Sequence, residues 1–383
     1  MKLRLLLTLA GLLLLAACDT TTNNTSTGPV DAVVITRAGD YTSGAHSVIS
    51  EGGNQTFSAS NELVPTTSDL AIAAYGNYFY RIERGGYDNI TKFAFADPQT
   101  IIWQYSTNDA GSAVSSNPHA MVFASDTKAY VIRYGSNKVW IVNPSATSEA
   151  QFKIGELDLS AYDDGDGIPE MENGIIVGHY LLITMQRLTG YIPSNISYVA
   201  VFDITTDTEV DTGYPGDGDK KGIPLVVRNP FSDIVYAASE DAVYVQGYGS
   251  FGYSGEDMYT GGIEKINLSD FSTEVVLDDG DETTHPYGNI AALAVVDATT
   301  AYFIGAQDYM TQNLYRLNPS TGVVTQSSIA NLSGIQLSGL KLDPKGRLWV
   351  GDVSNASMHI IDPSTDTEID SVSTKLPPID VAF

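Results

Sequence analysis

One loop carries the strongest chemical signal in the chain, Tyr162-Asp163-Asp164-Gly165-Asp166-Gly167-Ile168-Pro169-Glu170. Three carboxylates within four positions repel one another unless they are solvated or share a cation, and hard oxygen ligands select calcium over softer metals. We therefore expect a calcium site whose ligands are Asp163, Asp164, Asp166 and Glu170. The alternative is a solvated acidic turn.

These nine residues resemble the Asp-x-Asp-Gly-Asp-Gly-Ile-Pro-Asp loops of thrombospondin-type-three calcium repeats. The sequence departs from that pattern at the first ligand position, which falls on Tyr162, and at the last, which falls on Asn173. Asp163 or Asp158 would have to supply the missing oxygen. Two weaker acidic glycine stretches, Asp217–Asp219 and Asp278–Glu282, are expected in equivalent connections and predict a cation-attracting face.

Histidines and aromatic residues mark a second candidate site. His119 and His285 each stand just before an expected buried strand, so both are predicted near the mouth of a central channel. They have either a paired metal or substrate role or an ordinary loop role. Tyrosine offers a large rigid surface and a hydroxyl at small entropic cost, which suits recognition. The predicted ligand-binding residues are His119, Tyr191, Tyr248, Phe251, Tyr253, Tyr259, His285 and Tyr287.

The elements that must position these residues are clearest near the C-terminus. Four short strands are expected at Gly339–Asp343, Arg347–Asp352, Met358–Asp362 and Glu368–Ser373, with Asp343-Pro344-Lys345-Gly346 forming a tight turn. A four-strand meander cannot cover its own apolar faces, so the sequence should repeat it.

The repeat is visible in the turn that ends each third strand. Its Asp or Asn recurs with spacings of 46, 60, 64, 51 and 44 residues, at Asp97, Asn143, Asp203, Asn267, Asn318 and Asp362. These spacings bracket the length of a propeller blade. The innermost strands are predicted at Leu70–Ala74, Ala120–Ala124, Gly174–Val177, Ile223–Val227, Ile290–Val295 and Leu340–Leu342.

Both ends of the chain are expected to share a seventh blade. Pro378–Phe383 is a lone innermost strand, whereas Ala32–Ala38, His46–Ser50 and Gln55–Ser58 lack one. Joining them closes the ring and removes an open sheet edge. The predicted fold is an all-β, seven-bladed β-propeller that forms a single domain over residues 31–383.

Loop lengths distinguish the two faces of this predicted disc. The connections between second and third strands, and between blades, should share one face, which we call the long-loop face. The long insertions are assigned to it: Tyr105–Pro118, Glu156–Asn173, Arg187–Ile196, Asp211–Gly222, Gly247–Gly262 and Asp278–Asn289. Long loops on one face of a rigid scaffold are a usual place for binding or catalysis.

The N-terminus predicts export and a lipid anchor. Residues 1–17 have Lys2 and Arg4 ahead of an apolar run too short to span a bilayer, as in a secretory signal peptide. The segment Leu15-Ala16-Ala17-Cys18 resembles a bacterial lipobox, which implies lipidation of Cys18, the only cysteine. Residues 18–30 then form a polar tether. We expect an envelope protein at the outer membrane or cell surface rather than at the inner membrane.

The charge excludes one class of partner. The chain has 46 acidic and 20 basic residues, and loss of Lys2 and Arg4 with the signal would leave 18 basic residues and a net charge of −28. Such a field repels nucleic acids and favours cations, cationic complexes or neutral ligands.

Enzyme signatures are sparse, since metalloprotease, nucleophile-elbow and phosphate-loop motifs are absent from the sequence. The strand-end turn, best seen in Asn318-Pro319-Ser320-Thr321-Gly322, resembles the YVTN-type and lactonase-like bacterial propellers over residues 67–383. That resemblance specifies fold better than function.

The interpretation we favour is a lipid-anchored binding protein for a small molecule or metal complex that assists uptake with an outer-membrane receptor. The alternatives are a lactonase-like, metal-dependent hydrolase using His119 or His285, and a scaffold that docks another envelope protein.

Overall fold

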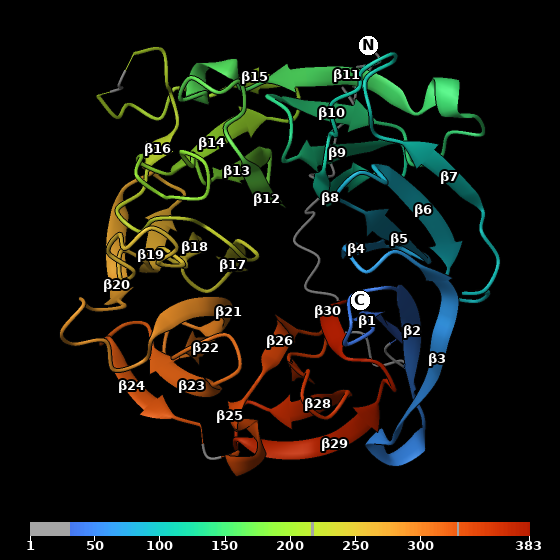
Figure 1. The fold of residues 1–383 in the computed structure, drawn as a ribbon, viewed down its shortest axis with the longest axis vertical. Coiled ribbons are helices and arrows are strands. Elements are labelled where there is room, and N and C mark those ends of the chain that lie inside the picture. The colour runs from blue at the N-terminus through green and yellow to red at the C-terminus, as the bar shows by residue number, and fades with distance from the viewer. Residues whose placement is uncertain (1–30, 216–217, 328) are drawn as a thin grey trace, which may run out of the picture.

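The computed structural model describes residues 31–215, 218–327 and 329–383, which form seven sheets arranged in a ring around one axis (Figure 1). The predicted signal peptide, Cys18 and the tether lie outside the described residues. Within the described residues, no helix has the length and apolar character needed to cross a membrane.

The first three sheets, each running from the axis outward, form blades 1 to 3. Their strands are β4 (Leu70–Tyr75), β5 (Tyr78–Glu83), β6 (Asn89–Ala94) and β7 (Trp103–Ser106); β8 (Pro118–Ser125), β9 (Lys128–Arg133), β10 (Lys138–Val142) and β11 (Lys153–Asp158); and β12 (Met171–Val177), β13 (Tyr180–Met185), β14 (Tyr198–Asp203), β15 (Thr208–Glu209) and β16 (Ile223–Pro224).

Blades 4 to 6 repeat the arrangement. Their strands are β17 (Val235–Ala237), β18 (Ala242–Gly247), β19 (Gly262–Asn267) and β20 (Thr273–Asp278); β21 (Asn289–Asp297), β22 (Thr300–Ala306), β23 (Gln312–Asn318), β24 (Val323–Gln326) and β25 (Ser333–Ile335); and β26 (Leu337–Leu342), β27 (Leu348–Asp352), β28 (Ser357–Asp362) and β29 (Thr367–Ser373). Short 3₁₀ turns lie at Gly53–Gln55, Glu149–Gln151, Ser160–Tyr162 and Ala330–Leu332.

Blade 7 closes the ring as predicted. Its strands are β30 (Pro378–Ala382), β1 (Asp31–Arg37), β2 (Gly44–Glu51) and β3 (Phe57–Thr66), in that order from the axis. Val381 pairs with Val34, so the last strand of the chain covers the inner edge of the first (Figure 1). The seven-bladed fold and its closure are therefore confirmed.

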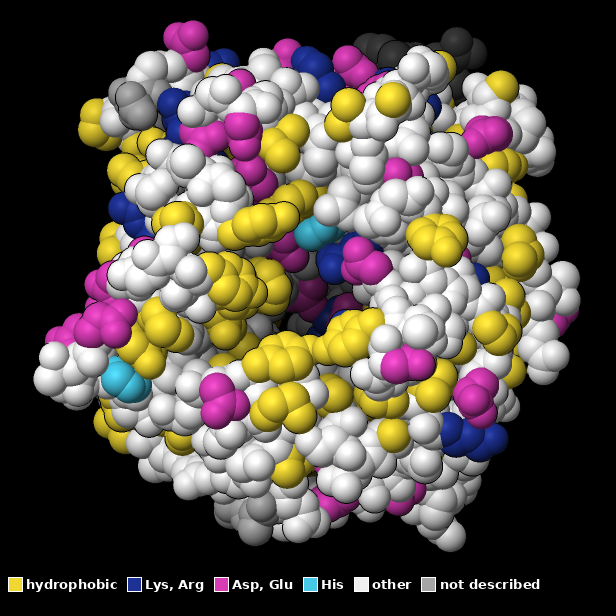
Figure 2. Space-filling view, in the orientation of Figure 1, with side chains coloured by type: hydrophobic (Ala, Val, Ile, Leu, Met, Phe, Trp, Pro, Cys, Tyr) yellow, Lys and Arg dark blue, Asp and Glu magenta, His cyan; other side chains and the backbone are white. Residues whose placement is uncertain are grey.

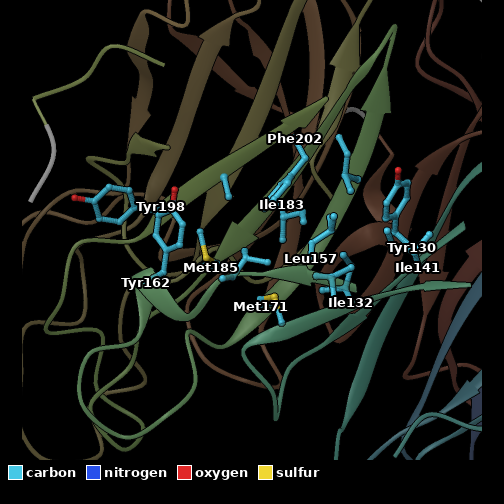
Figure 3. Packing of buried hydrophobic residues seen from close by; sticks show 14 residues of the cluster. Tyr130, Ile132, Ile141, Leu157, Tyr162, Met171, Ile183, Met185, Tyr198 and Phe202 are labelled. Carbon is cyan, nitrogen blue, oxygen red and sulfur yellow. The ribbon is translucent and has the colours of Figure 1, made fainter. Parts of the chain in front are cut away.

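Apolar side chains between neighbouring blades hold the ring together. Figure 3 shows the cluster between blades 2 and 3, where Ile132 and Leu157 of one blade meet Met171 and Ile183 of the next. The second strands are buried on both faces, as in β13, where five of six residues are buried. Because each blade needs its neighbour to cover it, the ring is stable only as a whole.

A tyrosine contact reinforces two of these boundaries. The Tyr130 hydroxyl donates to Asp207 Oδ1 of the following blade at 2.6 Å, and Tyr302 makes the same kind of bond to Asp366. Both acids have positive φ in the turn after a third strand. These bonds lie on the face of the short turns and fix the spacing of adjacent blades there.

One strand prediction was wrong in position. Ile223–Val227 is not the innermost strand of blade 4, because Ile223 pairs with Val199 and forms the second half of the outermost strand of blade 3. The innermost strand of blade 4 is the short β17. The insertion 211–222, of which Gly216 and Asp217 lie outside the described residues, therefore interrupts an outer strand and is not a connection between blades.

A second strand prediction was wrong in its length. The strand predicted at Gln55–Ser58 is β3, which runs from Phe57 to Thr66. Residues 59–66 were not predicted as strand because their composition is polar, and it is polar because one side of this outermost strand faces solvent. Glu62 and Val64 have positive φ, and the register against β2 shifts in this region, so the strand is also irregular.

Candidate functional site

The innermost strands surround a central cavity of about 370 Å³ that opens among the long loops. Its wall is apolar where the strands supply small residues, such as Ala71, Ala291, Ala292 and Gly339. Figure 2 looks along the axis and shows the hollow, with hydrophobic side chains at its rim and Lys or Arg, acidic and histidine side chains inside. Small organic molecules commonly bind in cavities of this size.

An aromatic pocket of about 360 Å³ adjoins this cavity and shares Phe231 and Phe251 with it. Its lining contains no charged residue and consists of Tyr134, Gln186, Leu188, Tyr191, Asn229, Phe231, Phe251 and Tyr253. Loops of blades 2, 3 and 4 supply these side chains. An uncharged, ring-rich pocket suits the planar or apolar part of a ligand.

The rings on one wall of the pocket stack in series. Phe251 lies 4.6 Å from Tyr248 and 5.5 Å from Tyr253, both between ring centroids, and Phe231 meets Phe251 edge-on at 5.6 Å. Their outer members remain open to solvent, with Tyr253 73% and Phe231 44% exposed. Tyr191 across the pocket is 77% exposed. Exposed aromatic groups gathered at a hollow mark a binding surface more often than scattered ones do.

Asn229 adds an unsatisfied polar group to this pocket. It is 1% exposed, its Nδ2 donates to the Gly249 carbonyl at 2.8 Å, and its Oδ1 has no hydrogen-bond partner among the described residues. Leaving a buried acceptor unpaired costs about 1–3 kcal/mol. A ligand N–H or O–H would remove that cost once the amide turns its oxygen toward the pocket.

Polar side chains at the cavity mouth are linked into a network around His119. Its Nδ1 lies 2.9 Å from Glu172 Oε2, which also accepts from Gln186 Nε2 at 3.1 Å. The His119 ring stacks on Tyr134 at 4.3 Å, and the Tyr134 hydroxyl donates to Gln186 Oε1. Burial lowers the pKa of His119, which favours the neutral imidazole despite the nearby carboxylate.

Deeper in the cavity one lysine joins three blades. Lys341 Nζ of blade 6 lies 2.9 Å from Asp233 Oδ2 of the loop before β17 and 2.9 Å from Asp380 Oδ1 of β30. Burial alone would lower the pKa of Lys341, but the two carboxylates outweigh it and raise the pKa. This lysine therefore stays charged and compensates two acids that would otherwise repel each other.

A separate cationic group stands at the mouth beside blade 7. The Arg37 guanidinium lies 4.1 Å from the centroid of the Tyr41 ring, and its Nη2 makes a long 3.5 Å contact with the Tyr309 hydroxyl. Tyr41 and Tyr309 share a 2.7 Å hydrogen bond. Burial raises the pKa of Tyr309, but hydrogen bonds with Tyr41 and Gln336 and the charge of Arg37 bring it below its usual value.

The predicted ligand-binding residues separate into two groups. The structure brings His119, Tyr191, Tyr248, Phe251 and Tyr253 together around the cavity and the aromatic pocket. The other three residues lie outside this lining. The prediction that His285 points to the channel mouth was wrong, since its ring stacks on Tyr259 at 4.0 Å and its Nδ1 contacts the Asp281 carbonyl. Tyr287 packs inward against Phe303 and Tyr315.

The acidic loop forms a compact carboxylate cluster in the connection between blades 2 and 3. One oxygen from each of Asp163, Asp164 and Asp166 lies within 4.8 Å of the others. Asp163 Oδ1 also accepts the backbone N–H groups of Gly165 and Gly167, so part of its capacity is used in forming the turn. The oxygen donors fit a hard cation such as calcium.

Glu170 is not part of that cluster. It is buried, and its Oε2 accepts the backbone N–H of Leu188 at 3.0 Å. Burial raises the pKa of its carboxyl to about 8. The equivalence expected for Asp217–Asp219 was wrong in its described part, Gly218 and Asp219, because they lie in the outer-strand insertion of blade 3. Asp278–Glu282 does begin the connection between blades 4 and 5.

The sequence interpretation missed Asn229, Phe231 and Asp233 because it placed a strand at Ile223–Val227. With residues 225–227 assigned to an innermost strand, the residues that follow would form a short turn on the opposite face. Two features contradict the strand. Pro224 and Pro230 bracket the segment, and proline cannot donate to a central ladder.

No family model and no curated protein sequence matches the chain. Solved structures do match. A putative 6-phosphogluconolactonase from Bacteroides fragilis has a TM-score of 0.60 at 13% identity, covering 95% of this chain and 99% of that one. A protein from Lactobacillus plantarum has a TM-score of 0.60 at 12% identity, with coverage of 92% and 99%.

The chain is a seven-bladed β-propeller. The dihydro-heme d1 dehydrogenase NirN in complex with DHE is a further match, with a TM-score of 0.51 at 11% identity, covering 91% of this chain and 66% of that one. At these identities the likeness concerns the fold. Function has to be argued from the site.

Proposed function

We propose that this protein is a binding protein that holds a small organic ligand where the aromatic pocket meets the central cavity. The observation that carries the proposal is the pairing of exposed stacked rings with the unsatisfied Asn229 Oδ1 in one pocket. The rings supply stacking surface, and the amide selects a ligand that donates a hydrogen bond. The lipid anchor predicted at Cys18 would hold this site close to a membrane.

Native mass spectrometry of the protein isolated from its source cells tests the proposal. We expect an additional mass that is released on denaturation. Tyr253→Ala should lower its occupancy, because a stacked ring contributes about 0.5–1.5 kcal/mol and hence up to roughly 10-fold in affinity. Tyr87→Ala is the matched control, since Tyr87 is 61% exposed and does not line the pocket. Equal occupancy in both variants, or none in the wild type, would contradict the proposal.

Uptake across the outer membrane is the role we propose for this binding, with an outer-membrane receptor as partner. The support is the predicted lipid anchor together with a ligand site on the long-loop face. Cross-linking in intact cells should then recover a β-barrel receptor with the protein. Recovery of only soluble envelope proteins would favour the scaffold alternative.

Calcium is proposed at Asp163, Asp164 and Asp166. It would relieve carboxylate repulsion, so calcium should raise the Tm relative to a chelator-treated sample. Asp164→Asn should remove that rise, whereas Asp257→Asn in another loop should keep it. No change in the wild-type Tm at about 1 mM calcium would contradict the proposal, because extracellular sites bind at or below this concentration.

A hydrolase is the second candidate, and the His119–Glu172 pair is the observation that favours it. The Glu172 carboxylate lies at Nδ1 of the His119 ring and orients that ring. Nε2 of His119 can then accept a proton from a ligand in the cavity, as a general base requires. The histidine pair expected for a metal is not assembled, since His285 lies outside the cavity lining. Turnover of lactones that is lost in His119→Gln would support this function, and binding without turnover would exclude it for those substrates.

A further inference from the structure

Arg37 differs from the other charged groups of the central cavity because the described part of the chain gives it no ionic partner. Among the described residues, Lys341 is paired with Asp233 and Asp380, Arg84 with Asp69, and His119 with Glu172. No carboxylate of the described chain lies within salt-bridge distance of Arg37, although the protein has 46 acidic residues. The nearest acid in sequence, Asp40, accepts hydrogen bonds from Thr42 instead.

The neighbours of Arg37 position its guanidinium without neutralising it. The Tyr41 ring supports it at 4.1 Å, and the Tyr309 hydroxyl meets Nη2 at 3.5 Å. The Tyr309 hydroxyl also bonds with Tyr41 and Gln336, so the remaining N–H groups of the Arg37 guanidinium are the principal donors at this point of the cavity. A planar guanidinium beside a phenol O–H is a donor set for an oxyanion.

The same cavity joins this donor set to the aromatic wall. Arg37 and Tyr309 line it beside blade 7, and Phe231, Tyr248 and Phe251 line it beside blade 4. We propose that Arg37, with Tyr309, binds a carboxylate or phosphate group of a ligand whose ring stacks on Phe251 and its neighbours. The ligand class is thus a ring-bearing oxyanion, and this inference rests on the proposed binding function.

Four small probes separate the two parts of the proposal: benzoate, phenyl phosphate, benzyl alcohol and benzylamine, titrated onto the full-length protein by saturation-transfer NMR. They share a benzene ring and differ in charge. We expect benzoate or phenyl phosphate to bind roughly 10-fold more tightly than benzyl alcohol, because charge-assisted hydrogen bonds are about twice as strong as neutral ones. Benzylamine should bind no more tightly than benzyl alcohol. Whichever anion binds more tightly identifies the preferred oxyanion.

Variants then assign the anion preference to Arg37. Arg37→Gln should bring the two anions to within about 2-fold of benzyl alcohol while leaving benzyl alcohol binding unchanged. Lys153→Gln makes the same change in net charge at an exposed ion pair on β11, the outermost strand of blade 2, and should keep the preference. Arg37→Lys keeps the charge but loses the planar set of N–H donors of the guanidinium, so it should retain only part of the preference for anions. Thermal unfolding of each variant verifies that it is folded.

The outcomes distinguish the two proposals. Probe binding that is weakened by Phe251→Ala but shows no anion preference, or an anion preference that persists in Arg37→Gln, overturns the oxyanion inference and leaves the binding function standing. Failure of all four probes to bind contradicts both. Tighter binding of benzylamine than of benzoate would instead show that the acidic field of the protein governs the site.

Discussion

Asp279 illustrates how burial changes a single carboxylate. It is fully buried, its Oδ2 accepts the Gly261 N–H at 3.0 Å, and no described residue bonds its Oδ1. Burial raises the pKa of Asp279 to about 7, and the neighbouring Asp278 adds to the effect. This acid therefore costs folding free energy whenever it is ionised, unlike the exposed acids of the surface.

The pH dependence follows from the direction of that shift. Between the ordinary aspartate pKa near 3.8 and about 7, the unfolded chain has lost its proton and the folded chain keeps it. The contribution of Asp279 to stability therefore falls as pH rises through this window, and the full cost applies above it. Asp279→Asn should gain about 4 kcal/mol at pH 8 relative to pH 4, since each unit of the pKa difference corresponds to about 1.4 kcal/mol. Urea unfolding at both pH values measures this, and a larger gain at pH 4 would contradict it.

At the scale of elements, the strand that closes the ring is the most sensitive to a buried charge. Val381 of β30 is fully buried opposite Val34. Val381→Asp should destabilise the protein by about 3 kcal/mol or more, because an unpaired carboxylate would lie between two blades. Val323→Asp is the same substitution at a position that is 58% exposed and should change stability by less than about 0.5 kcal/mol. Similar denaturation midpoints for the two variants would contradict closure by β30.

The elements also show which parts of the structure could be predicted from sequence. The blades could be predicted from the residues in their turns. Asp and Asn at strand ends accept local hydrogen bonds that stabilise a turn, as Asp362 does from Ser364. The prediction of an innermost strand was wrong at Ile223–Val227, since a short run of apolar residues occurs in inner and outer strands alike. The aromatic half of the site was predictable from Tyr253 and Phe251 in one loop. Arg37 was not, because whether the described residues place a carboxylate beside it depends on contacts between distant parts of the chain.

The whole molecule combines a rigid ring with a predicted anchor. If Cys18 carries lipid, Cys18→Ser removes the attachment point of the acyl chains, and stable anchoring needs two or more of them. The variant should therefore move from the membrane fraction to the soluble fraction. Fractionation with metabolic palmitate labelling measures this. The aromatic pocket is far in sequence from Cys18, so ligand binding should be unchanged. Membrane retention of Cys18→Ser without label would contradict the lipid anchor.

A crystal structure of the protein soaked with benzoate tests most directly whether the long-loop face is a ligand site. We predict a ring stacked at Phe251, with the carboxylate directed toward Arg37 and Tyr309. Benzoate bound only at the outer edge of the disc or on the short-turn face, with the central cavity holding solvent alone, would contradict this assignment.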